Sequence, residues 1–575
     1  PQPIRSDLPP GPTPISKPLV AYPHAMGQSV TGGIVYRGSQ HPGLNQAFLY
    51  GDYVTGLLWG VRQEEDRVTW NPLLAETGLQ IVAIAESAER EVLIVDYDGG
   101  IYQLVKNPAV GKPSDFPRRL SETGLFESTR PLVAAAGVIP YDLAAESWQH
   151  GMQSDFWVAI PGNETININA RHRSWNYPAG TVFVRTISAP SANEHANRLK
   201  LETQLLHFDG RQWQPYSFAW NRQQTDAMLV ESAGGAIDWW TQEASGSDVQ
   251  SWQILNRAQC RVCHSTQSGG AVGFTLANLG HPTSGTSQVD RLVDLQILDR
   301  RAPKNWSVRP MVDPRNPSAD MDTRARSYLA ANCGHCHSRG GGGTVPLELT
   351  FVNKANELNA IDVKPTQGSF GINDARVIVP GDPYRSVLFY RIATSGTGHM
   401  PKLASHDNDV DGLKLVHDWI LSLDESAASQ PRPTKLPEAV ADTSDSLRLL
   451  GQLLFDESGP AMRLTAAKTA AQRGNVVTAA IFERFLPPDQ RRQRLGEHVD
   501  PQQILEITGN APRGREILTN PQRSQCTLCH RIQGSGQSVG PDLDGIASKR
   551  SREHLLTSIL RPSAEIEPQY SSHAV

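Results

Sequence analysis

The stretch "TRARSYLAANCGHCH", residues 323–337, joins a helical pattern to a Cys-x-x-Cys-His motif. The first part predicts a helix, and this helix runs directly into Cys333, Cys336 and His337. The fold here is therefore expected to be helical, with two thiols and an imidazole gathered at the end of one helix.

All six cysteines of the chain fall into three copies of this motif. One match by chance, in a chain of 575 residues with 6 Cys and 17 His, has odds of about 1 in 500. Three matches with no cysteine left over are therefore not a coincidence. The copies are "CRVCH" (Cys260, Cys263, His264), "CGHCH" (Cys333, Cys336, His337) and "CTLCH" (Cys526, Cys529, His530).

This spacing is typical of covalent haem attachment, because two thiols add across the haem vinyl groups and the adjacent histidine supplies an axial ligand. A zinc site needs four ligands, usually from two paired knuckles. The motifs lie about 70 and about 190 residues apart, and three of them cannot pair off. A redox dithiol is the third alternative, and a disulfide framework is excluded if haem takes all six thiols. We therefore predict three covalently attached haem c groups.

Length and composition fit a soluble multidomain protein. A chain of 575 residues holds three to five domains by length. Its net charge is −5 and it has no basic stripe, so nucleic acid is not an expected partner. No apolar run is long enough to span a membrane. Haem c is attached outside the cytoplasm, so we expect a periplasmic or extracellular location and a chain that has lost a signal segment.

The first 250 residues read as β structure. Residues 1–110 contain short aromatic and β-branched runs such as "AFLYGDY" and "EVLIVDYDG", punctuated by Gly, Asn and Asp. That spacing predicts antiparallel meanders like the blades of a propeller, but only about two blades fit, and a propeller needs at least four. Residues 111–250 predict a β-rich, sandwich-like module.

The rest of the chain turns helical. We predict a first cytochrome c module at 251–322 and a second at 323–424, in which a helix carrying Tyr328 crosses a helix at 411–423. That later helix has Leu413, Val416, Trp419, Ile420 and Leu423 on one side. Residues 425–440 are a linker by composition. A helical region at 441–505 and a third cytochrome c module at 506–575 follow.

The sixth iron ligands are harder to predict. For the second haem, "GTGHMPKL" places Met400 in a Gly- and Pro-stiffened loop, with His399 as the rival. For the first haem, Met311 competes with Met321 and His281, and a packing role is the alternative for a methionine.

No methionine follows the third motif. Only His554 and His573 lie beyond it, and His554 reads as a surface residue of a helix. Pro541 is placed for its carbonyl to accept from the proximal imidazole of His530, which would orient the ring.

An acidic cluster admits two interpretations. "DNDVDG", residues 407–412, matches the start of a calcium loop, with Asp407, Asp409 and Asp411 at alternate positions and Asp418 at the twelfth. The alternative is a set of capping and first-turn acids of the 411–423 helix, where the helix dipole favours negative charge.

Three stretches of the chain resemble known families. "SVTGGIVYRG" and "LNQAFLYGDYVTGLLWGV" resemble the last blades of the glucose/sorbosone dehydrogenase family of β-propellers. Residues 115–424 resemble a di-haem cytochrome module fused to such propellers, through "LSETGLF", "RARSYLAANCGHCH", "IVPGDPYRSVLFYRIAT" and "HMPKL". Residues 436–575 resemble a planctomycete-type haem-binding region, through "IFERFLP", "CTLCHRI" and "VGPDLDGI".

The resemblance implies roles for the haem cysteines, the proximal histidines and Met400. It does not imply a quinone site, because "GDYVTGLLWG" and "AETGLQIVAIA" lack the Lys and Arg that hold pyrroloquinoline quinone in relatives that use it.

Three functions remain open. The leading hypothesis is a tri-haem electron carrier, in which the protein sets potentials through ligands and burial. The second is the electron-accepting portion of a quinone-dependent sugar or alcohol dehydrogenase, whose propeller segment lies elsewhere. The third is a haem-wiring subunit of a larger respiratory or extracellular assembly. Redox partner proteins are expected in each case.

Overall fold

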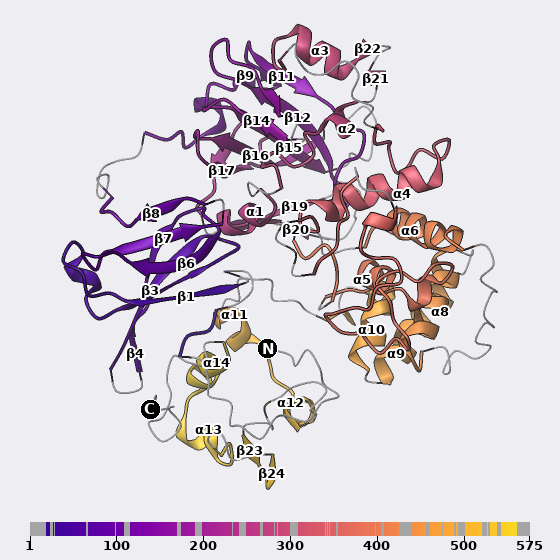
Figure 1. The fold of residues 1–575 in the computed structure, drawn as a ribbon. Coiled ribbons are helices and arrows are strands. Elements are labelled where there is room, and N and C mark those ends of the chain that lie inside the picture. Colours follow the sequence, from indigo (N-terminus) through magenta and orange to yellow (C-terminus); the bar gives the residue numbers. More distant parts are fainter. Residues whose placement is uncertain are drawn as a thin grey trace. The chain divides into compact units, whose positions relative to one another are not determined.

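The computed structural model describes two compact units, one formed by residues 3–110 with 492–575 and the other by residues 111–491 (Figure 1). Within them the described residues are 19–22, 27, 29–64, 67–97, 99–107, 115–169, 174–189, 198–232, 234–240, 249–264, 268–280, 282–283, 286–299, 309–339, 341, 343, 345–351, 355–396, 398–403, 408–424, 440–455, 459–473, 475–487, 490–492, 501–519, 526, 530–536 and 542–560.

The first unit begins with two antiparallel sheets. One has the order β1-β2-β3-β4, with β5 also paired to β3, and the other has the order β6-β7-β8. Their buried side chains share one core, which contains Leu49, Leu58, Ile81 and Ile94. The meanders expected at 1–110 are present, but the described strands do not close into a propeller. The strands are β1 (Val30–Val35), β2 (Phe48–Asp52), β3 (Leu57–Glu64), β4 (Arg67–Trp70), β5 (Leu73–Glu76), β6 (Ile81–Glu86), β7 (Val92–Asp96) and β8 (Ile101–Gln103).

The second unit is built on one six-stranded antiparallel meander, with the order β11-β12-β15-β16-β17-β18. Neighbouring residues alternate between its two faces: Phe183 and Leu206 enter one core, and Val184 and Leu205 the other. The strands are β11 (Val138–Tyr141), β12 (Gln153–Ala159), β15 (Val182–Ala189), β16 (Leu199–Phe208), β17 (Trp213–Trp220) and β18 (Ala227–Leu229).

Short pairs of strands accompany this sheet. They are β9 (Phe126–Thr129) with β10 (Leu132–Ala134), β13 (Asn167–Asn169) with β14 (Ser174–Asn176), β19 (Gly235–Trp240) with β20 (Val249–Ile254), and β21 (Pro282–Thr283) with β22 (Thr286–Ser287). The described strands thus form one large sheet rather than the two large sheets of a sandwich. Segments that follow the sheet in sequence cover the face that carries Phe183, through Phe274, Leu279, Leu292 and Leu298.

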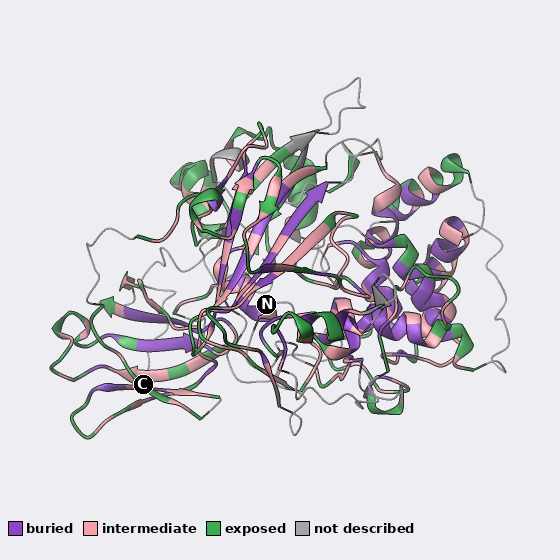
Figure 2. Ribbon diagram, turned by 90° about the horizontal axis from the view of Figure 1, so that it is seen from above, coloured by how far each residue is buried: buried purple, intermediate pink, exposed green. Residues whose placement is uncertain are grey.

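Those segments carry three short helices, α1 (Arg257–Cys263), α2 (Leu276–Leu279) and α3 (Gln288–Asp294). A larger helical part follows, whose interior is drawn as buried in Figure 2. Its core joins Leu329, Phe389, Trp419, Leu450 and Phe482. The helices are α4 (Met321–Leu329), α5 (Val387–Ala393), α6 (Val410–Ser422), α8 (Thr443–Phe455), α9 (Pro460–Gln472) and α10 (Val476–Phe482).

The helix expected at 411–423 is confirmed as α6. Leu413, Val416, Trp419 and Ile420 are fully buried, and Leu423 packs at the edge of the same core. Helices α4 and α6 pack together as expected, and the indole Nε1 of Trp419 donates to Asp322 Oδ1 at 3.1 Å.

The first unit ends with α11 (Pro501–Glu506), α12 (Ala511–Thr519), β23 (Arg531–Ile532), β24 (Ser535–Gly536), α13 (Ile546–Lys549) and α14 (Arg552–Leu560). Among the described residues of both units, we find no helix with the length and hydropathy needed to cross a bilayer. Among the described residues, antiparallel sheets dominate the first half of the chain, and helices dominate the second half.

The contact between α4 and α6 depends on the absence of a side chain at Gly412. A Cβ atom there would overlap the ring of Tyr328. We expect Gly412→Ala to lower the free energy of unfolding by about 2–3 kcal/mol, as overpacking of a closed core does. Thermal and urea unfolding followed by circular dichroism measures this change.

Gly459→Ala is the matched control, because a Cβ atom at Gly459 would meet nothing within 4 Å. Gly459 is the N-cap of α9, where alanine is less favourable than glycine, so we expect a loss of about 0.5–1 kcal/mol, well below that of Gly412→Ala. Equal destabilisation by the two variants would show that the α4–α6 contact is not tight.

Candidate haem-attachment site

The first motif lies on α1, close to the large sheet. Asn256 and Gln259 form a reciprocal capping box at the start of the helix, with two bonds of 2.8 Å. The helix ends at the motif, where the His264 N–H donates to the Cys260 carbonyl at 3.0 Å. Both cysteines of this motif therefore project from one fixed helical turn.

The imidazole of His264 is oriented by a backbone carbonyl. Its Nδ1 lies 2.7 Å from the carbonyl oxygen of Gly270, so Nδ1 carries the proton and Nε2 keeps its lone pair. Gly270 has φ +71°, and a Cβ atom there would overlap the indole of Trp213. Burial lowers the pKa of His264 to about 4, so the ring is neutral at pH 7. A neutral, oriented imidazole is what an iron ligand requires.

The second motif follows α4 through a π-helical turn, η3 (Ala330–Gly334). Such turns are frequent at functional sites. Within this turn the buried Asn332 accepts from the Trp148 N–H at 2.7 Å and donates to the Tyr328 carbonyl at 2.9 Å. The His337 N–H then donates to the Cys333 carbonyl at 2.8 Å. The turn is thus fixed both to α4 and to the loop after β11.

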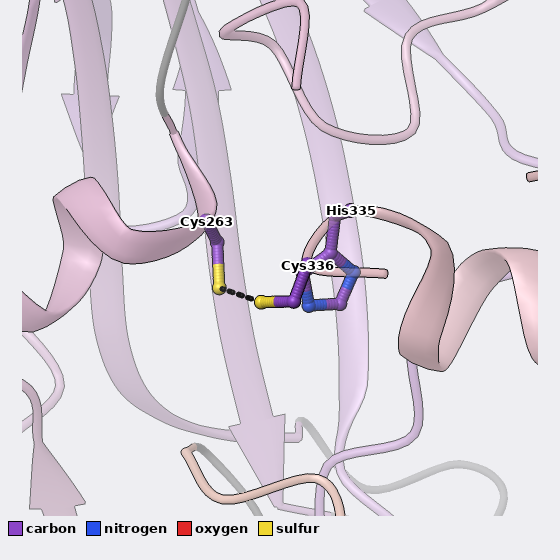
Figure 3. A group of neighbouring side chains, drawn as sticks. All are labelled: Cys263, His335 and Cys336. Atoms are coloured by element: carbon purple, nitrogen blue, oxygen red, sulfur yellow. Dashed lines mark hydrogen bonds between the residues drawn. The ribbon is translucent and has the colours of Figure 1, made fainter. Parts of the chain in front are cut away.

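The two motifs meet in space. Cys263 Sγ and Cys336 Sγ are 3.9 Å apart, and a ligand atom of His335 lies within 4.8 Å of both (Figure 3). Contact with Cys336 and burial raise the pKa of the Cys263 thiol. The hydrogen bond that Cys263 donates lowers the pKa of Cys336, and the nearby His335 lowers it further. Nothing in the local sequence pattern predicted this proximity or a role for His335.

The remaining groups of the two motifs are also enclosed. Burial raises the pKa of Cys260 and of Cys333 to about 12. Among the described residues, the buried Nδ1 atoms of His335 and His337 have no hydrogen-bond partner. Two thiols with an adjacent imidazole are the groups that a covalent haem uses, so the residues present fit that group.

The third motif belongs to the other unit. The His530 N–H donates to the Cys526 carbonyl at 2.8 Å, as in the first motif. Three of its residues, Cys529, Pro541 and His573, lie outside the described residues. The bond from the His530 ring to the Pro541 carbonyl and the identity of the sixth ligand therefore stay predictions. His554 lies on α14 and is half-exposed.

Met400 is half-buried at the end of the loop that follows α5. Its N–H donates to the Arg391 carbonyl at 3.0 Å. The pKa of His337 is lowered mainly by burial, and the positive charge of the Arg391 guanidinium lowers it further. Arg391 thus links Met400 to the second motif, and the role of Met400 as an iron ligand stays a prediction. The rival His399 is buried, and its Nδ1 lies 2.9 Å from the Thr394 carbonyl.

Met311 is buried near the second motif. It is 5% exposed and packs with Ala277, Ala330 and Ala331, the last two of which lie three and two residues before Cys333. It also lines a cavity of about 1320 Å³, whose described lining includes neither His264 nor His337. Its rival Met321 is 38% exposed at the start of α4, and His281 lies outside the described residues.

The acidic cluster is occupied by protein contacts. Asp409 Oδ1 accepts from the Gly412 N–H at 3.0 Å as the N-cap of α6, and Asp418 Oδ2 accepts from Lys414 Nζ at 2.6 Å. Asp411 lies in the first turn of the helix, and Asp407 lies outside the described residues. These contacts favour capping, and calcium stays a prediction.

Comparison with known proteins finds a relative for a short part of the chain. No family model and no solved structure matches this chain. It is 34% identical over 68 residues to a cytochrome c-553-like protein of Synechocystis sp., a match that covers 12% of this chain and 60% of that protein. The chain thus spans less than two thirds of this curated relative, and a short region of it is similar to a c-type cytochrome.

Proposed function

We propose that this protein transfers electrons through covalently attached haem c. The similarity to a cytochrome c-553-like protein supports at least one such group. The three Cys-x-x-Cys-His motifs support three, held at Cys260/Cys263, Cys333/Cys336 and Cys526/Cys529 with His264, His337 and His530 as proximal ligands. Haem c supplies one-electron chemistry when bound.

The observation that carries the proposal is the contact between the first two motifs. Cys263 and Cys336 are 73 residues apart in sequence, yet their sulfur atoms are 3.9 Å apart. Groups attached to these two sulfur atoms have neighbouring edges, and a short separation is what an electron needs to pass between them. The ends of α1 and η3 thus keep the two attachment points of one redox pair in fixed positions.

The chain's own residues set the properties of this pair. The Gly270 carbonyl accepts from His264 and makes its free nitrogen a stronger ligand. Met400 is the proposed distal ligand of the second motif, and a His–Met pair favours a high reduction potential. Because haem c is attached outside the cytoplasm, we place the protein in the periplasm or outside the cell.

The test is a haem count on the intact chain. An alkaline pyridine haem spectrum, combined with an intact mass, is expected to give three haems per polypeptide. Reduction with dithionite should then shift the Soret band and sharpen the α band of all three. A colourless protein, or a mass equal to the bare polypeptide, would end the electron-transfer proposal, and a count of one or two would restrict it to fewer motifs.

A further inference from the structure

The cluster of Cys263, Cys336 and His335 has a geometry of its own. Cys263 is the last residue of α1, and the other two residues lie just after η3. Figure 3 shows the two sulfur atoms facing each other with the imidazole beside them. All three ligand atoms lie within 4.8 Å of one another, and the three side chains are half-buried.

The distance between the two sulfur atoms is that of a tetrahedral zinc site, and a ligand atom of His335 lies within 4.8 Å of both. With Zn–S bonds of about 2.3 Å, two thiolates on one Zn²⁺ lie about 3.8 Å apart, and a sulfur and an imidazole nitrogen lie about 3.6 Å apart. The observed distance between the two sulfur atoms is 3.9 Å. One ion could therefore reach all three ligand atoms with little movement of the backbone.

His335 supplies the independent reason to expect a ligand. Its Nδ1 is buried and has no hydrogen-bond partner among the described residues. A buried polar atom left without a partner costs about 1–3 kcal/mol, and a bond to a metal ion at either ring nitrogen fixes the ring and its tautomer. His335 is also the one imidazole of its motif that the proposed haem ligation does not use.

We propose that the chain, before haem is attached, binds one Zn²⁺ through Cys263 Sγ, Cys336 Sγ and a nitrogen of His335, with water in the fourth position. Two thiol protons leave as the two Zn–S bonds form, and no electron is transferred. A sulfur atom bound to zinc is not available for thioether formation, so zinc and haem exclude each other at these two cysteines. Only this competition rests on the proposed function; the zinc site itself does not.

The experiment uses the full chain, produced in a reducing cytoplasm without haem attachment and stripped of metal. Titration with Co²⁺ as the probe is expected to show a thiolate-to-cobalt absorption band that saturates at one ion per chain and disappears when Zn²⁺ is added. Cys263→Ser and Cys336→Ser should each abolish the band. His335→Ala should weaken binding at least about tenfold.

Cys526→Ser is the matched control, because it removes a thiol of the same kind from the other unit, and it should leave the band unchanged. His335→Gln, checked by circular dichroism for an intact fold, separates loss of a ligand from loss of structure. No band, or the same loss with Cys526→Ser, would overturn the zinc site and leave the haem count untouched. An unchanged yield of haem attachment in the presence of Zn²⁺ would overturn the competition alone.

Discussion

A Cys260→Ala/Cys263→Ala variant is expected to carry two haems per chain, and the potential of the haem at the second motif should shift by about 60 mV. The contact between the first two motifs is the reason, because with haem attached at both, as we propose, an electron on one group would lie close to the other. Two unit charges about 12 Å apart interact by about 1.4 kcal/mol at an effective dielectric constant of about 20. That energy is about 60 mV for one electron.

The sign of the shift follows from the order of reduction in the intact protein. If the second haem is reduced after the first, the electron already on the first haem makes this reduction less favourable. Removing the first haem then raises the potential of the second. If it is reduced first, the positive charge of the oxidised neighbour favours it, so removing that neighbour lowers its potential. A redox titration of the unmodified protein, followed by absorbance, decides which case applies.

The control is Cys526→Ala/Cys529→Ala. This variant also leaves two haems, but it alters the motif in the other unit of the chain. We expect the titration of the first two haems to keep its shape. A shift of equal size in both double variants would mean that the contact between Cys263 and Cys336 does not couple two redox groups.

The sequence was most informative where one local pattern was sufficient. The spacing of Leu413, Val416, Trp419 and Ile420 predicted α6 because a helix that packs on a core shows its buried side in a window of a dozen residues. The capping interpretation of Asp409 was available for the same reason, since a cap acts within three residues. Both features depend on contacts that are short in sequence.

The meeting of the first two motifs could not be read from the sequence. It depends on how α1 and α4 are placed by the sheet and by the loop that Asn332 holds, and such contacts leave no local period. The motifs are far apart along the chain, which disfavoured a shared zinc ion, but separation along the chain says little about separation in space. The same limit applies to the six-stranded sheet, where a sandwich-like module was expected. The alternation of Phe183 and Val184 shows that both faces of the sheet are covered, but it does not show which segments cover them.

Met400→His is expected to lower the potential of one haem by roughly 0.2 V, a fraction of the ~0.8 V that axial ligands and their surroundings cover among haem proteins. A thioether favours the reduced iron, and a second imidazole favours the oxidised iron. The position supports Met400, because its N–H bonds to the carbonyl of Arg391, the residue whose charge acts on His337. A spectroelectrochemical titration measures the change, and the haem should stay low-spin.

The control makes the same substitution at a methionine outside the site. Met462 is 55% exposed on α9, and Met462→His should leave all potentials unchanged. The rival ligand gives the opposite pattern: if His399 binds the iron, Met400→His changes nothing and His399→Met raises one potential. The bond between His399 Nδ1 and the Thr394 carbonyl does not decide between the two residues, because His264 makes the same kind of bond to the Gly270 carbonyl. The pair of variants makes that decision, and we expect the methionine variant to be the one that moves the potential.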